Sequence, residues 1–225
     1  MYLVFVLYAL FASVFIIAKT GLEYSQPLFL MGSRMVLAGI IMLGYEIYKN
    51  PKKFNFNKTI LFRLFALATF NIYLTNALEL WGLQYLTAFK TCFIYSLSPF
   101  LAALLSYFVF SEALSQKKWL GLFIGIIGIT PALLSQSSAE EGTSLLFISW
   151  PEIALIVATL SSAYGWILLK QIVQENNYSP FMANSLSMLI GGTMALVHSS
   201  LVEEWNPIPV TEFVPYFECT IALLV

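Results

Sequence analysis

Four charged side chains stand in or beside apolar segments, and their types suit the recognition of an anionic group. Arg34, Glu79 and Lys90 lie within such segments, and Lys19 lies at the end of one. A charge in hydrocarbon is costly, so it normally faces a cavity or a partner. Three of the four charges are positive, which favours a substrate that carries a carboxylate. Arg34 is the best clamp because its planar guanidinium donates two parallel hydrogen bonds.

A purely structural role for these charges is the alternative. Arg34 and Glu79 could form an ion pair that serves packing, and the two lysines could extend their ammonium groups to the membrane surface. We take Arg34, Lys90 and Glu79 as candidate substrate-binding residues and leave Lys19 outside that set.

Uncharged polar residues recur at helical spacing beside these charges. One stripe runs from Asn71 to Glu79 in steps of four residues, which places its members on one helix face. A second stripe follows Lys90. Two stripes on neighbouring helices favour a polar cavity, although hydrogen bonds between helices are the alternative for each residue. The candidate lining residues in these stripes are Thr75, Asn76, Tyr95 and Ser98.

Three further residues qualify this site. Tyr164 and Trp166 could stack on an aromatic or cationic part of a substrate, although a tryptophan placed like Trp166 more often faces lipid or serves packing. His198 is the one histidine of the chain, and we interpret it as an interface residue rather than a proton carrier.

The composition places these residues in an integral membrane protein. Hydrophobic residues make up 59% of the chain, charged residues 10%, and the mean hydropathy is +0.81; soluble domains are about 25% charged. We predict an all-α membrane fold of seven to eight transmembrane helices, because a span needs roughly 20 apolar residues. The expected spans are 2–18, 27–48, 60–82, 86–110, 118–134, 149–170 and 180–201, with an eighth beginning at 212.

The distribution of positive charge predicts the orientation. Eight of the eleven Lys and Arg residues fall in loops on one side when the N-terminus is cytoplasmic. The loops on the other side carry glutamates instead. Because cytoplasmic loops are enriched in Lys and Arg, we predict a multi-pass protein of the bacterial inner membrane with a cytoplasmic N-terminus.

The stretch Leu86–Pro131 carries an ordered series of motifs. Ser-Pro-Phe lies at 98–100 in one apolar run, and Pro99 predicts a kink there. Ser-Glu-Ala-Leu at 111–114 and Lys-Lys-Trp-Leu-Gly at 117–121 follow, and then Gly125 and Gly128 in the next run. This order resembles the EamA-type permeases of the drug/metabolite transporter superfamily. Gly121 and Gly125 are assigned to helix packing.

The resemblance implies a ten-helix plan built from two inverted five-helix repeats. The first repeat would be 1–137 and the second 138–225, incomplete at its C-terminus, because the chain ends inside an apolar run and three helices of the plan are expected beyond it. A weak internal repeat agrees: Gly39 lies twelve residues past Pro27, and Gly192 lies twelve past Pro180. An odd number of spans per repeat inverts the second copy, as in many secondary transporters.

The resemblance also implies a function. It indicates a secondary-active carrier of a small polar metabolite, amino-acid-like or S-adenosylmethionine-like, that works by alternating access. The S-adenosylmethionine uptake carriers are a plausible neighbouring group, since that substrate would suit a carboxylate clamp with aromatic contacts. A homodimer is left open as a further partner.

Other classes of function find less support. The chain has no aspartate and only two separated cysteines, which argues against aspartyl intramembrane enzymes and against a metal site. We expect no cofactor, and no basic stripe points to nucleic acid. No segment resembles a channel filter. An intramembrane enzyme and a non-transporting membrane scaffold stay as alternatives.

Overall fold

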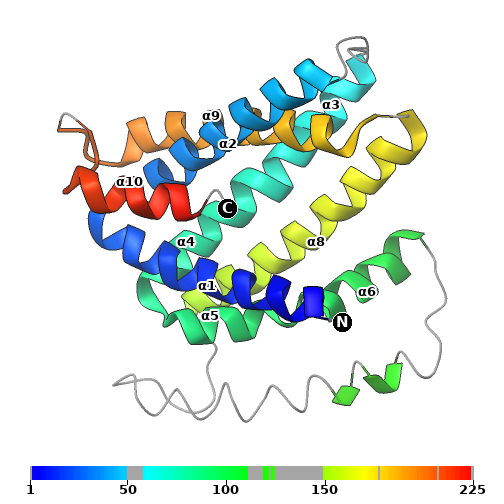
Figure 1. Cartoon of the computed structure of the whole chain (residues 1–225). Coiled ribbons are helices and arrows are strands. Elements are labelled where there is room, and N and C mark those ends of the chain that lie inside the picture. Colours follow the sequence, from blue (N-terminus) through cyan, green and yellow to red (C-terminus); the bar gives the residue numbers. More distant parts are fainter. Residues whose placement is uncertain are drawn as a thin grey trace.

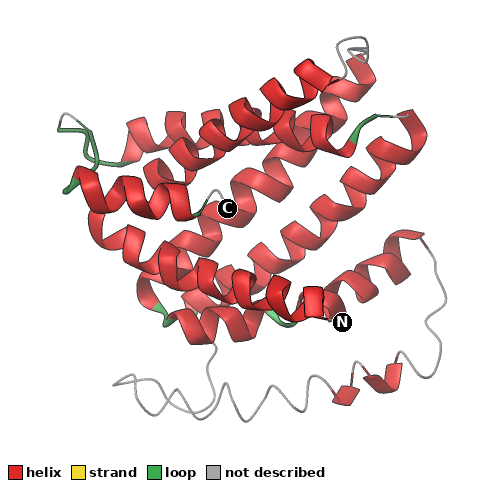
Figure 2. Cartoon of the chain, viewed as in Figure 1, coloured by secondary structure: helices red, strands yellow, loops and turns green. Residues whose placement is uncertain are grey.

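Helices account for almost all of the chain that the structure describes. The computed structural model describes residues 2–49, 58–110, 119–121, 123–124, 149–176, 178–206 and 208–223, and within these ranges the connections 25–26 and 86–87 are short (Figures 1 and 2). The elements are α1 (Tyr2–Tyr24), α2 (Pro27–Lys49), α3 (Lys58–Leu67), the π-helix η1 (Ala68–Leu74), α4 (Thr75–Tyr85), α5 (Ala88–Tyr95), α6 (Ser98–Phe110), α8 (Trp150–Asn176), α9 (Pro180–Val202) and α10 (Phe213–Ala222).

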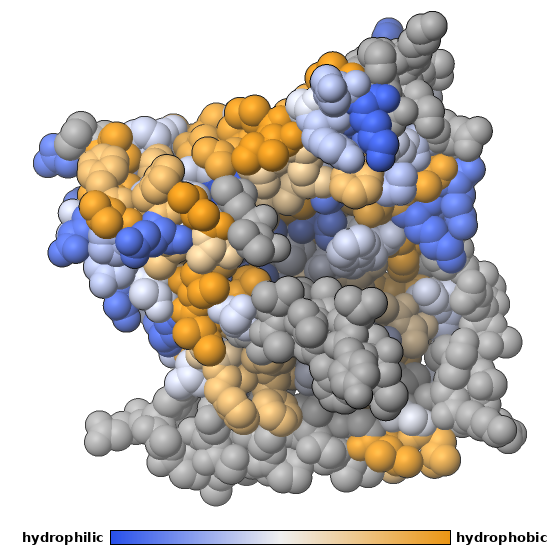
Figure 3. Space-filling view, viewed as in Figure 1, coloured by the Kyte–Doolittle hydropathy of each residue, from blue (hydrophilic) through white to orange (hydrophobic). Residues whose placement is uncertain are grey.

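In the part of the chain that the structure describes, five helical segments are long and apolar enough to cross a membrane. They are Pro27–Lys49, Lys58–Tyr85, Ala88–Phe108, Trp150–Gln174 and Pro180–Val202. Figure 3 shows hydrophobic side chains across the upper part of one face and hydrophilic ones toward its left and right edges. This distribution is the one a bilayer requires, because the ends of the spans meet water. The expectation of an all-α, multi-pass membrane protein is confirmed.

Two helices continue past the lysine at which a span was expected to end. Lys19 does not end the first helix, since α1 continues to Tyr24, and Lys170 does not end the sixth span, since α8 continues to Asn176. Both helices carry polar residues beyond the lysine. A span predicted from hydropathy ends before such residues, whereas a helix can include them.

The predicted fifth span lies largely outside the described residues. Within 118–134 the structure describes 119–121 and 123–124, all helical. A side chain at Gly121 would meet open space there, so the expected packing role of this glycine is not seen among the described residues. Gly125, Gly128 and the proposed boundary between 137 and 138 also lie outside the described residues.

Among the described residues, two spans depart from regular α-helix. The span Lys58–Tyr85 contains seven residues of π-helix, Ala68–Leu74, which the sequence pattern did not predict. The span that begins at Ala88 is broken between α5 and α6, at Ser96 and Leu97. The break confirms the kink predicted from Pro99, which has no N–H to donate to the carbonyl of Tyr95.

Helices α2 and α9 pack against each other in antiparallel directions. A Cβ on Gly39 would lie 2.9 Å from the Leu189 Cγ, and a Cβ on Gly192 would lie 2.9 Å from the Val36 nitrogen. The two helix backbones therefore approach so closely that only glycine fits at either position. Both helices have 23 residues and begin with proline. The two close contacts are equivalent under a shift of 153 residues (192 minus 39, and 189 minus 36), which also relates Pro27 to Pro180.

Candidate functional site

Arg34 reaches from α2 into the interior and is held there by an amide. Its Nη2 donates to the Asn76 Oδ1 of α4 at 2.9 Å, and the Asn76 Nδ2 donates to the Ile72 carbonyl at 2.8 Å. Both side chains are 9% exposed. The amide therefore orients its oxygen toward the guanidinium, because its nitrogen is committed to the backbone. The structure therefore brings together Arg34 and Asn76, two of the candidate residues selected from the sequence.

Glu79 is held from a third helix. Tyr95 of α5 donates from its hydroxyl to the Glu79 Oε2 at 2.6 Å. The ring of Tyr95 packs on Phe15 of α1, with centroids 5.3 Å apart. Glu79 and Arg34 are near enough for their charges to interact, but among the described residues they form no direct ion pair. The structural alternative of an Arg34–Glu79 pair is therefore not what the structure shows.

The π-helix joins the site to α8. The carbonyl of Phe70 accepts from the Thr75 hydroxyl at 2.8 Å and from the Ser161 hydroxyl of α8 at 2.7 Å. The Thr75 hydroxyl also lies 3.3 Å from the Ala158 carbonyl. The wider turn leaves carbonyls without their usual partners, and hydroxyls supply the missing donors. Thr75 is thus occupied with backbone groups.

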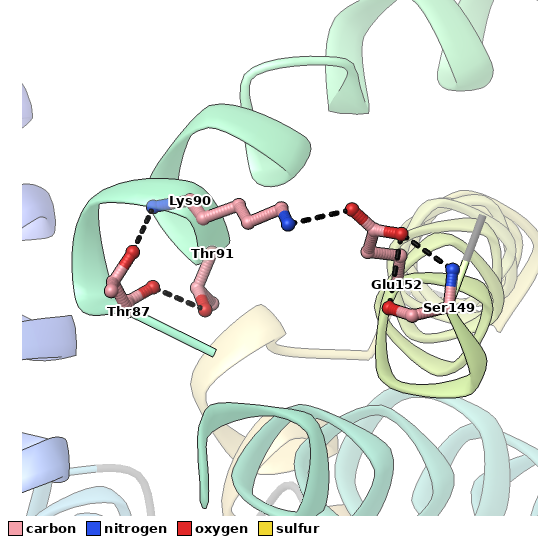
Figure 4. Close-up of polar contacts among 5 residues, drawn as sticks. All are labelled: Thr87, Lys90, Thr91, Ser149 and Glu152. Atoms are coloured by element: carbon pink, nitrogen blue, oxygen red, sulfur yellow. Dashed lines mark hydrogen bonds and ion pairs between the residues drawn. The ribbon is translucent and has the colours of Figure 1, made fainter. Parts of the chain in front are cut away.

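Lys90 forms a buried ion pair that connects α5 to α8. Its Nζ lies 2.9 Å from the Glu152 Oε1, with side-chain exposures of 5% and 17%. Figure 4 shows the lysine extended from its own helix toward the carboxylate, whose other oxygen accepts from the backbone N–H and the hydroxyl of Ser149 at 2.6 and 3.0 Å. The alternative in which Lys90 extends to the membrane surface is not what the structure shows, because the lysine is 4% exposed.

Glu152 changes the charge of the site. The sequence interpretation counted three positive groups and one negative group there. With Glu152 included, the described charges are Lys19, Arg34 and Lys90 against Glu79 and Glu152. Lys19 donates to the carbonyl of Leu86, and Lys90 is paired. Arg34 is therefore the cation whose hydrogen-bond partner is a neutral side chain, and it is the best placed to bind a carboxylate.

The remaining candidates lie apart from this cluster. Ser98 is half-buried and begins α6, after the break. Tyr164 of α8 packs edge-on against Phe70, at 5.2 Å between ring centroids. Trp166 is 60% exposed, which favours the alternative of contact with lipid. His198 accepts or donates at Nδ1 with the Tyr73 hydroxyl, at 2.8 Å.

Sequence reasoning missed Glu152 and Ser161. Glu152 lies in the order Ser149-Trp-Pro-Glu152, which is the Ser-x-x-Glu signature of a helix N-terminus, so a search for caps would have found it. No comparable signal marks Ser161, because its role depends on the π-helix. In the part of the chain that the structure describes, no group of three His, Cys, Asp or Glu residues could hold a metal ion.

Comparison with known proteins adds an independent line of evidence. The profile of the EamA-like transporter family matches residues 1–134. The S-adenosylmethionine/S-adenosylhomocysteine transporter of Chlamydia muridarum is 36% identical over the whole of this chain and 70% of its own length. The protein of the same name from Chlamydia trachomatis serovar L2 is 36% identical over the whole of this chain and 68% of its own. An uncharacterized transporter of Synechocystis is 28% identical over 88% of this chain and 62% of its own.

Proposed function

The chain belongs to the EamA-like transporter family, and we propose that it carries S-adenosylmethionine and S-adenosylhomocysteine across a bacterial inner membrane. It is a multi-pass membrane transporter of a small metabolite, not an enzyme, in keeping with its family and relatives. The observation that carries the choice of substrate is the 36% identity to two transporters named for these compounds, over all of this chain.

The polar cluster around Arg34 supports this substrate. Both compounds have an α-amino-acid end, and Arg34 supplies the planar donor that a carboxylate requires. Tyr95 and Phe15 add aromatic surface beside the cluster. We propose that Arg34, Asn76, Glu79 and Tyr95 form the core of the binding site. Contact of the substrate with Thr75, Ser98, Tyr164 or Trp166 stays a prediction from the sequence.

We further propose transport by alternating access between two inverted repeats. The equivalent close contacts of Gly39 and Gly192 support a pseudo-twofold axis between α2 and α9. The Lys90–Glu152 pair would then join the first repeat to the second. With a cytoplasmic N-terminus this pair lies toward the outer side. It would have to open when the site faces outward, so we propose it as an outer gate.

A homodimer stays a prediction for the assembled protein. Gly121 and its exposed neighbours Trp119 and Leu120 would be open to packing against another helix. Analytical ultracentrifugation in detergent would decide this.

The proposed function is tested by exchange in proteoliposomes. Vesicles loaded with unlabelled S-adenosylhomocysteine should accumulate radiolabelled S-adenosylmethionine only when they contain the protein, and unlabelled substrate outside should abolish the signal. Exchange of neutral amino acids without exchange of either nucleoside would show that the protein carries an amino acid instead of the proposed substrate. The absence of any exchange or binding would favour a membrane scaffold.

A further inference from the structure

Two opposite charges in the cluster are each held by a neutral partner instead of by each other. The guanidinium of Arg34 donates a hydrogen bond to the Asn76 amide oxygen, and the carboxylate of Glu79 accepts one from the Tyr95 hydroxyl. Asn76 and Glu79 are three residues apart on α4, so their side chains are neighbours on one face, with Cβ atoms about 5–6 Å apart. The two charges are close but not in contact.

This arrangement is unusual for a pair that serves packing alone. Opposite charges attract strongly where water is scarce, and a buried ion pair is favourable only when the two groups meet in good geometry. Here the amide and the phenol keep the charges apart. Each charge therefore retains the capacity to bind a group of opposite sign.

We propose that Arg34 and Glu79 together read the two charges of an α-amino acid, with Arg34 binding the α-carboxylate and Glu79 binding the α-ammonium. The inference rests on the proposed function and names the part of the substrate that this site recognises. The two charged groups of an α-amino acid are joined through one carbon and lie about 3 Å apart. They could thus insert between the guanidinium and the carboxylate in a single orientation.

The neutral partners act as stand-ins for the substrate. The amide oxygen of Asn76 occupies the position of a carboxylate oxygen, and the hydroxyl of Tyr95 occupies that of an ammonium N–H. Binding exchanges each stand-in for a charged group, so no charge is left unsatisfied in either state. This exchange lowers the cost of an empty site, since a buried charge without a partner is strongly unfavourable.

The other cations of the cluster are less suited to this role. Lys90 already contacts the Glu152 carboxylate, and Lys19 contacts a backbone carbonyl. An ammonium is also a point charge, without the planar fork that matches a carboxylate. The recognition of the amino-acid end therefore falls to Arg34 and Glu79.

The test begins with ligands on the unmodified protein. Binding is measured for S-adenosylmethionine, its decarboxylated form, S-adenosylhomocysteine, its N-acetyl derivative and methylthioadenosine. Loss of one charge-assisted contact should weaken binding about 10- to 100-fold. The decarboxylated and N-acetyl compounds should therefore bind at least 10-fold more weakly than their parents, and methylthioadenosine should bind most weakly.

Variants then assign each charge to its residue. In Arg34→Gln, the affinities for S-adenosylmethionine and its decarboxylated form should differ by less than about 3-fold, because the variant has already lost the contact with the carboxylate. In Glu79→Gln, the affinities for S-adenosylhomocysteine and its N-acetyl derivative should likewise differ by less than about 3-fold. Arg63→Gln and Glu204→Gln, which change an arginine of α3 and an exposed glutamate, should keep both penalties. A purely structural role would instead weaken parent and modified ligands equally.

The outcomes separate this inference from the proposed function. If parent and modified nucleosides bind the unmodified protein with affinities within about 3-fold of each other, Arg34 and Glu79 do not recognise the amino-acid charges, and the proposed transport function is unaffected. If no nucleoside binds, the proposed substrate is wrong. Binding of methionine is then compared with binding of its decarboxylated amine, which tests whether Arg34 and Glu79 recognise an α-amino acid. If the two cluster variants do not fold, the ligand comparison on the unmodified protein decides alone.

Discussion

Lys90 and Glu152 form an ion pair of 2.9 Å between the N-termini of two helices. Thr87 caps α5 and accepts from the Lys90 backbone N–H at 3.2 Å, so the lysine stands in the first turn. A cation is unfavourable there and an anion is favourable, because of the helix dipole. Glu152 of α8 therefore compensates the positive charge of Lys90, which the N-terminus of α5 disfavours.

Removing one member of this pair should cost more than removing both. Lys90→Met leaves Glu152 uncompensated and should lower the free energy of unfolding by about 3 kcal/mol, as other broken buried pairs do. The double variant Lys90→Met/Glu152→Gln should recover part of this loss. Unfolding in detergent, followed by a double-mutant cycle, measures the coupling. Additive effects of the two changes would show that the pair does not contribute as a unit.

If the pair is also an outer gate, a cross-link across it should stop transport. A bis-methanethiosulfonate reagent that joins Lys90→Cys to Glu152→Cys through a spacer should abolish substrate exchange, and reduction should restore it, because the two backbones lie further apart than a direct disulfide can span. Each single cysteine variant treated with the same reagent serves as the control. Full exchange by the cross-linked protein would exclude a gate at this position.

Glu203 should stabilise the start of α2. Its two carboxylate oxygens accept from the backbone N–H groups of Leu28 and Phe29 at 2.6 and 3.0 Å. Glu203→Gln should therefore lower the unfolding free energy by about 1–2 kcal/mol, because a charge-assisted cap at a helix N-terminus is lost. The adjacent and exposed Glu204 provides the matched control, and Glu204→Gln should change the melting temperature little. Equal effects of the two changes would refute the cap.

Small side chains should be required where α2 meets α9. Gly39→Ala and Gly192→Ala place a methyl group within about 3 Å of neighbouring atoms, and overpacking of this kind costs about 1–3 kcal/mol. Gly44 lies on the same helix with nothing within 4 Å of an added Cβ. Gly44→Ala should be neutral or slightly stabilising, since alanine favours helix. Unfolding in detergent compares the three variants.

Tyr95 should be less important for binding than Glu79. If its hydroxyl only stands in for a substrate ammonium, Tyr95→Phe should keep the affinity for S-adenosylhomocysteine within a few-fold while lowering the stability of the empty protein. Glu79→Gln should lower the affinity at least 10-fold. Calorimetric titration of both variants measures this difference. A larger loss of affinity in Tyr95→Phe would make the phenol a direct contact with the ligand.

Much of the fold could be predicted because the bilayer constrains it so strongly. The spans that begin at Pro27, Lys58, Ala88, Trp150 and Pro180 were each expected to within a few residues. The proline-induced break was expected too, since Pro99 removes a specific donor. The π-helix was not, because one extra residue in a turn leaves no mark on hydropathy and depends on hydroxyls such as Ser161 from another helix.

The members of the polar cluster were predictable by residue type, but their contact partners were not. Arg34, Asn76, Glu79 and Tyr95 were selected because polar groups in hydrocarbon are costly, and the structure brings all four together. Which group meets which depends on three helices that are distant in sequence. Lys90 shows this limit, since its partner Glu152 lies 62 positions later (152 minus 90) and was recognisable only as a helix cap.

The most direct test of the account is the effect of S-adenosylmethionine on the melting temperature of the purified protein and of two arginine variants. A ligand that binds only the folded state raises the melting temperature as its concentration rises. We expect this rise for the unmodified protein and for Arg63→Ala, and its loss in an Arg34→Ala variant that remains folded. An equal rise in all three proteins would remove Arg34 from the site. No rise in any of them, with S-adenosylhomocysteine equally inactive, would contradict the proposed substrate.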